Sequence, residues 1–213
     1  MINYYPINLV LKGKRCLVIG AGAVAERKAR RLVECGARVM VVSPSITPGL
    51  MAMAGKKKIS FKHKKFSLRD LSGAYMVIAA TTDRSVNASV SSYCLKRGIL
   101  VNIVDSPKEC NFILPSIIRR GALTITISTQ GISPALSKKI RKDIENTFGA
   151  EYAALLGMVK KIRPYVIKKI KNMSSRRVFF NKMFRPEILD LARRGKGAQA
   201  MRKLKKYLDN ARI

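Results

Sequence analysis

A glycine turn near the start of this chain separates an apolar segment from a helical one and narrows the folds that the chain can adopt. Residues 15–19 predict a short buried strand, the turn Gly20-x-Gly22-x-x-Ala25 follows directly, and residues 26–35 have a helical composition. In such a turn the first glycine permits the tight bend, the second lets the backbone approach a pyrophosphate, and the third small residue keeps helix and strand close. The free N–H groups at the helix start favour phosphate. The arrangement predicts nucleotide binding, and the alternative is a tight turn without a ligand.

Apolar runs and helical segments continue to alternate beyond this turn. Four further strands are predicted, at residues 39–42, 59–61, 76–81 and 100–104. A helix capped by Asp83 and ended by Gly98 is expected between the last two. Helices that alternate with apolar strands predict an α/β fold with a Rossmann-like, doubly wound parallel sheet.

The pattern changes after Pro107. Residues 122–128 alternate between apolar and polar side chains, which indicates a half-exposed strand at a sheet edge or a subunit interface. A helix is expected to begin at Ser133 and Pro134, and the sequence beyond it is helical and basic. Helix breaks are expected near Gly149, Pro164, Ser174, Ser175, Pro186 and Gly195. We therefore divide the chain into three parts, residues 1–112, 113–150 and 151–213.

The chain is strongly basic, with 43 Lys and Arg against 12 Asp and Glu and a formal net charge of +31. Its apolar content of 47% excludes low-hydrophobicity disorder. The charge suits a polyanionic partner, and a basic surface without a specific partner explains it equally. We expect no nucleic-acid partner, because the sequence has no zinc finger, RNP-like run or aromatic-interleaved basic stretch.

Membrane and metal association are not expected either. No run approaches the roughly 18 apolar residues of a membrane span, and the N-terminus lacks the features of a signal peptide. The four cysteines form no CxxC pair, and with one histidine a structural zinc site is not expected. Reduced thiols favour a cytoplasmic location. His63 lies in a run of lysines and is interpreted as a solvated surface residue.

The end of the second predicted strand bears on the choice of cofactor. A Rossmann site usually has an Asp or Glu there for the ribose, and this chain has Ser43-Pro44-Ser45 instead. Serine hydroxyls and backbone groups can hold a ribose in its place. No arginine nearby is placed for a 2′-phosphate, so we predict NAD rather than NADP.

Asp105 is the candidate catalytic residue. It follows the predicted strand 100–104, at the edge where ligands bind in open α/β sheets. An acid at this edge is a candidate for proton transfer. A turn-forming Asp before Ser106-Pro107 is the alternative, and the residues alone leave both interpretations open.

Several short motifs occur in a fixed order along the chain. They are residues 5–13 (YPINLVLKG), 18–28 (VIGAGAVAERK), 79–81 (AAT), Asn87, 101–105 (VNIVD), 112–115 (FILP) and 128–134 (STQGISP). As a set they resemble the precorrin-2 dehydrogenase and sirohydrochlorin ferrochelatase family, the N-terminal module of siroheme synthase. The resemblance covers about residues 4–145 and, more loosely, the helical tail.

The resemblance implies that the chain oxidises precorrin-2 to sirohydrochlorin with NAD as hydride acceptor. Many members of the family also insert ferrous iron to give siroheme, and the aspartate that matches Asp105 is implicated in both activities. The resemblance further implies nucleotide contacts at Ala23, Val24, Pro44 and Ser45. The predicted cofactor-binding residues are therefore Gly20, Gly22, Ala23, Val24, Ser43, Pro44 and Ser45.

A homodimer is also implied. Its parts are an NAD-binding Rossmann domain (1–112), a dimerisation region (113–150) and a helical basic domain (151–213). No metal site is predicted in the protein, because the sequence offers no cluster of ligands and the nitrogens of the substrate would hold the iron.

Thr129 aligns with a serine that is phosphorylated in some fused members. The anionic tetrapyrrole gives the positive charge a partner, and the alternative function is a non-catalytic nucleotide-sensing module with a basic tail.

Overall fold

The computed structural model describes residues 3–210, and the chain divides between Leu114 and Pro115 into two compact units. The division into three parts, after residues 112 and 150, stays a prediction. No helix in the described part of the chain is long and apolar enough to cross a membrane.

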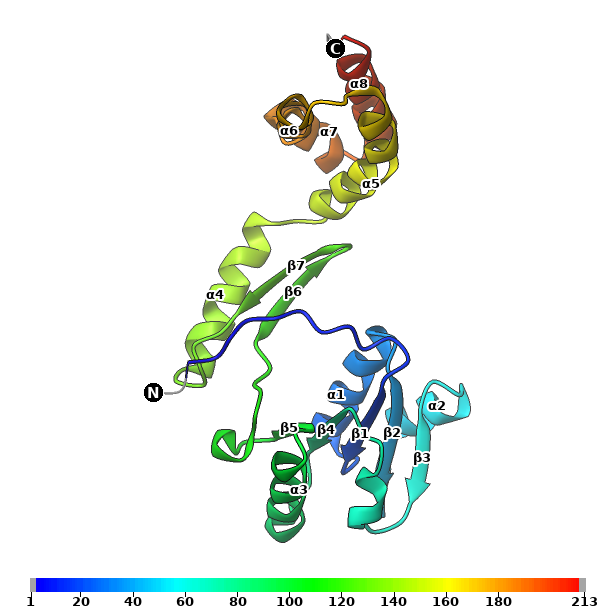
Figure 1. The fold of residues 1–213 in the computed structure, drawn as a ribbon, viewed down its shortest axis with the longest axis vertical. Helices are drawn as coiled ribbons and strands as arrows, with labels where there is room; N and C mark the ends of the chain where they lie inside the picture. Colours follow the sequence, from blue (N-terminus) through cyan, green and yellow to red (C-terminus); the bar gives the residue numbers. More distant parts are fainter. Residues whose placement is uncertain (1–2, 211–213) are drawn as a thin grey trace. The chain divides into compact units, whose positions relative to one another are not determined.

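Within residues 3–114, a five-stranded parallel sheet forms the centre of the first unit (Figure 1). Its strands are β1 (Arg15–Ile19), β2 (Arg38–Ser43), β3 (Ser60–His63), β4 (Met76–Ala79) and β5 (Leu100–Ile103). They lie in the order β3-β2-β1-β4-β5, and every neighbouring pair is parallel, so the predicted Rossmann-like sheet is confirmed. Ile19 pairs with Val42 on one side and Ala79 on the other. The carboxyl ends of these three strands therefore meet at one edge of the sheet.

Helices cover both faces of this sheet. They are α1 (Ala23–Glu34), α2 (Pro48–Gly55), α3 (Arg84–Lys96) and the short 3-10 helix η1 (Leu68–Leu71). Val18 packs with Leu50 of α2 on one face, and Leu17 packs with Val90 of α3 on the other. Because neighbouring residues of a strand point to opposite faces, β1 is apolar and buried on both sides.

The helix predicted after residue 83 is confirmed. Asp83 caps α3 by accepting the N–H groups of Ser85 and Val86. Helix α2 was not predicted from the sequence. Thr47 caps it by accepting the N–H of Leu50.

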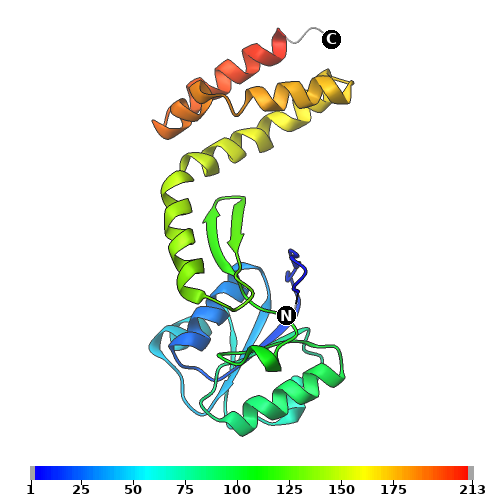
Figure 2. The ribbon, with the colours of Figure 1, turned by 90° about the vertical axis from the view of Figure 1, so that its left-hand side faces the viewer.

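The second unit begins with an antiparallel hairpin, β6 (Ser116–Arg120) and β7 (Leu123–Ile127), and continues with α4 (Pro134–Thr147). Residues of β7 alternate between half-buried and exposed, which confirms the predicted half-exposed strand. Ser133 caps α4, as predicted, by accepting the N–H of Leu136. Figure 2 shows α4 lying alongside the hairpin.

The helices that follow in the described residues have a hydrophobic core of their own. They are α5 (Glu151–Lys169), α6 (Met173–Lys182), α7 (Pro186–Arg193) and α8 (Gly197–Asp209). Their core includes Leu155, Ile162, Phe179, Ile188 and Leu204.

The helix break expected at Pro164 is wrong, because α5 continues through this residue. A proline inside a helix costs roughly 3 kcal/mol. The helix buries one stripe of apolar side chains, formed by Leu155, Met158, Ile162 and Val166. Each such side chain contributes about 1.5–3 kcal/mol when buried, so the stripe outweighs the proline.

The break expected near Ser174 and Ser175 is confirmed, because α5 ends at Lys169 and α6 begins at Met173, so that both serines lie in the first turn of α6. The chain leaves the helical conformation just before them, where Asn172 caps α6 by accepting the N–H of Ser175. The other expected breaks are confirmed. Helix α4 ends just before Gly149, α7 begins at Pro186, and α7 ends just before Gly195.

Candidate functional site

The glycine turn lies where the ends of β1, β2 and β4 meet. Gly20 donates its N–H to the Val42 carbonyl oxygen at 3.0 Å and has a φ of +94°. A Cβ on Gly20 would lie 2.5 Å from the carbonyl oxygen of Ala80, closer than side chains approach in real structures. The neighbouring strand end alone therefore requires glycine at this position.

Gly22 is under no such constraint from the protein itself. Its φ is −76°, which any residue adopts, and it stands directly before α1. A Cβ built on Gly22 would meet no atom within 4 Å. The space over this residue is open, as the close approach of a pyrophosphate to the backbone requires.

The start of α1 is also suited to an anion. No side chain caps α1, whereas Thr47 caps α2 and Asp83 caps α3. An uncapped helix start leaves its first N–H groups, including those of Ala23 and Val24, without an acceptor inside the helix. Such groups and the helix dipole together favour a phosphate.

The loop after β2 is held next to this turn. Ser43 is buried, its Oγ accepts the N–H of Ser45 at 3.3 Å, and its carbonyl oxygen accepts the N–H of Lys64 at 3.2 Å. His63 is exposed, as expected, and its Nε2 donates to the Pro44 carbonyl oxygen at 2.8 Å. The histidine therefore has a role that sequence reasoning missed, because it fixes the loop that carries the predicted ribose contacts.

Sequence reasoning also missed a carboxylate that joins this loop to α1. Glu26, in the first turn of α1, accepts a hydrogen bond from Thr47 Oγ1 at 2.6 Å and pairs with Arg30 at 2.6 Å. These bonds lower the pKa of the Glu26 carboxyl, and the hydrogen bond from Thr47 has the largest effect. Gly49 leaves room for this carboxylate, since a Cβ there would overlap it and displace the Glu26 side chain. The sequence shows Arg30 four residues after Glu26, a spacing typical of an ion pair within a helix, but it does not reveal Thr47 as a partner.

Asp105 lies in a turn that directly follows β5. The N–H of Ser106 bonds the Ile103 carbonyl oxygen at 3.3 Å, and Asp105 has a left-handed backbone with φ +61°. Aspartate is one of the few residues besides glycine that visit this conformation. The residue is exposed. Asp105 therefore forms the turn, and its side chain remains accessible for the proton transfer that stays a prediction.

Lys28 of α1 interacts electrostatically with Asp105. Burial, followed by the charges of Arg27 and Arg31, lowers the pKa of the Lys28 ammonium group, and the Asp105 carboxylate acts in the opposite direction. Asp105 is thus within electrostatic reach of the helix that follows the glycine turn. The predicted catalytic residue and the predicted phosphate site belong to the same edge of the sheet.

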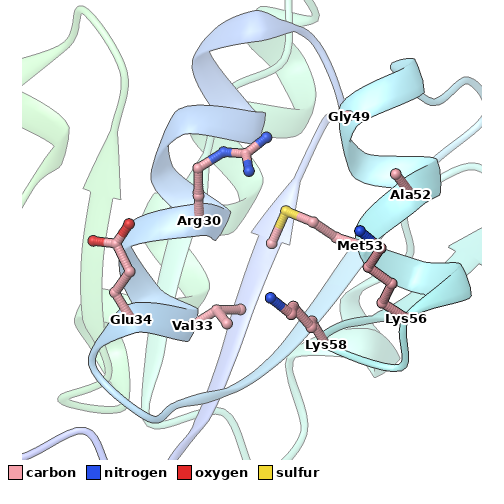
Figure 3. Close-up of a pocket in the computed structure, with 8 residues that line it drawn as sticks. All are labelled: Arg30, Val33, Glu34, Gly49, Ala52, Met53, Lys56 and Lys58. Carbon is pink, nitrogen blue, oxygen red and sulfur yellow. The ribbon is translucent and has the colours of Figure 1, made fainter.

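A hollow of about 300 Å³ lies between α1 and α2 (Figure 3). It is lined by Arg30, Val33, Glu34, Gly49, Ala52, Met53, Lys56 and Lys58. None of the predicted cofactor-binding residues lines it, so we do not assign the cofactor to this hollow. Among residues 3–210, no group of three or more His, Cys, Asp and Glu side chains could hold a metal ion.

A parallel Rossmann sheet whose first helix starts uncapped over a glycine turn defines a dinucleotide-binding domain. Residues 7–116 match the model of a family described as "Putative NAD(P)-binding", NAD_binding_7, and the chain belongs to this family. Residues 120–147 match the model described as "Sirohaem biosynthesis protein central", and residues 151–208 match the "Sirohaem synthase dimerisation region". These matches confirm the resemblance that the motifs indicated.

Curated relatives of this chain are described as siroheme synthases. That of Stutzerimonas stutzeri (strain A1501) is 38% identical over 207 residues, which cover 97% of this chain and 44% of the relative. That of Thioalkalivibrio sulfidiphilus (strain HL-EbGR7) is 36% identical and covers 98% of this chain and 42% of the relative. The chain therefore spans less than half the length of these two relatives. Among solved structures, "SirC, precorrin-2 dehydrogenase" matches with a TM-score of 0.79 and 27% identity, over 96% of this chain and 100% of that one.

Proposed function

We propose that this chain is an NAD-dependent dehydrogenase that oxidises precorrin-2 to sirohydrochlorin. The similarity to SirC, which spans all of that chain and nearly all of this one, carries the proposal. The open space over Gly22 beside an uncapped helix start supports a dinucleotide as the cofactor. The loop Ser43-Pro44-Ser45 offers no cation for a 2′-phosphate, which supports NAD rather than NADP.

The residues that would hold NAD are those of the glycine turn and of the loop after β2. The N–H groups of Ala23 and Val24 suit the pyrophosphate, and the missing side chain of Gly22 gives it room. Ser43 and Ser45 offer a buried and an exposed hydroxyl beside the ribose position. When bound, NAD supplies the hydride acceptor of the reaction.

Asp105 is the proton acceptor in this proposal. Oxidation of precorrin-2 removes a hydride and a proton, and an exposed carboxylate on a fixed turn can take the proton. Ferrous iron is a second substrate in the same proposal, with Asp105 taking pyrrole protons while the nitrogens of the tetrapyrrole hold the metal. The formal charge of +31 suits a substrate that carries many carboxylates.

The active form is a homodimer, in which the second unit supplies the contacts between protomers. The sequence predicts a dimerisation region at residues 113–150, and the family model of the dimerisation region matches residues 151–208. Neither range includes a strand of the Rossmann sheet. Cys16, Cys94 and Cys110 are free thiols, which suits the reducing cytoplasm as the setting of the reaction.

The test is the formation of NADH when enzymatically generated precorrin-2 is added to the protein and NAD. We expect NADH from the wild type and none from Gly22→Asp, which places a negative charge where the pyrophosphate belongs. Because a Cβ at this position meets no atom within 4 Å, Gly22→Asp should still fold. NAD binding by the wild type without any turnover would favour the alternative function, a non-catalytic nucleotide-sensing module.

A further inference from the structure

β5 is an edge strand of the sheet, and the chain returns along its open side. Asn111 takes the place of a neighbouring strand there. Its N–H donates to the Val101 carbonyl oxygen at 3.2 Å, its Oδ1 accepts the N–H of Val101 at 2.7 Å, and its Nδ2 donates to the Ile99 carbonyl oxygen at 2.9 Å. Residues 104–109 therefore form a closed loop between β5 and the returning segment, and Asp105 lies in this loop.

Cys110 ties the two ends of that loop together. Its Sγ accepts the N–H of Ile103 at 3.1 Å. The same Sγ lies 3.2 Å from the carbonyl oxygen of Ser106 and 3.4 Å from that of Ile103, and the thiol can donate to either. Ile103 and Ser106 are the two ends of the hydrogen-bonded turn that contains Asp105. One thiol therefore contacts both ends of this turn.

The thiol is itself held in place by its neighbours. Asn102 Nδ2 donates to the Phe112 carbonyl oxygen at 3.1 Å and lies 3.6 Å from Cys110 Sγ. Ser91 Oγ of α3 donates to the Glu109 carbonyl oxygen at 2.8 Å. Burial raises the pKa of the Cys110 thiol, so the group keeps its proton and remains a hydrogen-bond donor.

We propose that Cys110 is a positioning residue for Asp105. By bonding both ends of the turn, the thiol fixes the backbone from which the Asp105 carboxylate reaches the substrate. Asp105 needs this support because its φ of +61° is uncommon for a residue other than glycine. The inference rests on the proposed function, in which Asp105 accepts a proton. Misplacing such a group by about 1 Å costs on the order of 10²-fold in rate.

The experiment compares Cys110→Ala and Cys110→Ser in the full chain, each with and without Asp105→Asn. A serine hydroxyl keeps a donor and an acceptor, whereas alanine has neither. We expect Cys110→Ala to lower kcat about 10- to 100-fold while the KM for precorrin-2 and the Kd of NAD stay within about 2-fold. Cys110→Ser should keep most of the wild-type kcat. Cys110→Val, which restores volume without hydrogen bonds, should behave like Cys110→Ala.

The Asp105→Asn background separates positioning from general stabilisation. If Cys110 acts through Asp105, Cys110→Ala should lower the remaining single-turnover rate of Asp105→Asn by less than about 2-fold, because residues that act as a unit are not additive. Cys94, buried on α3 against the same face of the sheet, is the matched control. Cys94→Ala should lower the thermal midpoint and leave kcat unchanged.

Three results would overturn the inference. They are an unchanged kcat in Cys110→Ala, a joint loss of kcat and NAD affinity, and an equally large loss on the Asp105→Asn background. A different result, full activity of Asp105→Asn with an intact Cys110, would remove the proton acceptor of the proposed function and the role of Cys110 with it. The single variant of Asp105 therefore tells the two failures apart.

Discussion

The two glycines of the turn should respond differently to the same substitution. At Gly20, alanine would place its Cβ 2.5 Å from the carbonyl oxygen of Ala80, on a backbone with φ +94°. A positive φ costs a residue other than glycine about 1–2 kcal/mol, and overpacking adds about 1–3 kcal/mol. Gly20→Ala should therefore lower the free energy of unfolding by about 2–5 kcal/mol.

At Gly22, the same methyl group meets no protein atom within 4 Å. Gly22→Ala should change the free energy of unfolding by less than about 0.5 kcal/mol. It should weaken NAD binding, because the methyl group occupies the space that the pyrophosphate needs. An overlap of about 1–3 kcal/mol corresponds to a rise in the Kd of about 5- to 160-fold.

Urea denaturation of both variants measures the free energy of unfolding, and titration with NAD measures the Kd of each folded protein. We expect Gly20→Ala to show the loss of stability and Gly22→Ala to show the loss of affinity. Binding of NAD by Gly22→Ala as tight as that of the wild type would rule out a pyrophosphate over Gly22. An equal loss of stability in the two variants would contradict the different surroundings of the two glycines.

Other variants and conditions test the remaining steps of the account. Asp105→Asn keeps a side chain that tolerates the left-handed backbone but removes the proton acceptor. The kcat of NADH formation should therefore fall on the order of 10²–10⁴-fold while the Kd of NAD stays the same. Unchanged turnover would contradict the role of Asp105 as proton acceptor. Added salt should raise the KM for precorrin-2 and leave kcat nearly unchanged, because exposed charges are screened beyond roughly 8 Å at physiological ionic strength. A kcat/KM that ignores salt would count against steering by the positive charge. A fragment of residues 1–114, the first compact unit, should be monomeric by light scattering, and a stable dimer would move the protomer contacts into the Rossmann domain.

The parts of the fold that depend on local sequence were predictable. The strand predicted at residues 15–19 is β1, Arg15–Ile19. Helices cover both faces of the sheet, so a central strand is buried on both sides and is visible in the sequence as a continuous apolar run. Asp83 and Ser133 cap α3 and α4 as expected, since each cap involves an N–H only two or three residues away. The glycine turn was recognisable for the same reason.

Contacts between distant segments were not predictable from the sequence. α5 continues through Pro164 because its apolar stripe packs in a core shared with α7 and α8, which the local sequence does not reveal. Glu26 bonds Thr47, which lies 21 positions further along the chain. His63, interpreted as a solvated surface residue, bonds the Pro44 carbonyl oxygen because parallel pairing of β2 and β3 brings their ends together. The chemical role of Asp105 stays a prediction, because its turn and its accessibility fit both interpretations of the sequence.

The ratio of NADH to sirohydrochlorin formed under anaerobic conditions shows whether this chain oxidises precorrin-2 with NAD. Both products are measured in one reaction of the wild-type chain with NAD and enzymatically generated precorrin-2, beside a reaction without protein. We expect one NADH for each sirohydrochlorin above that background. Sirohydrochlorin without NADH, or neither product from a protein that binds NAD, would contradict this expectation.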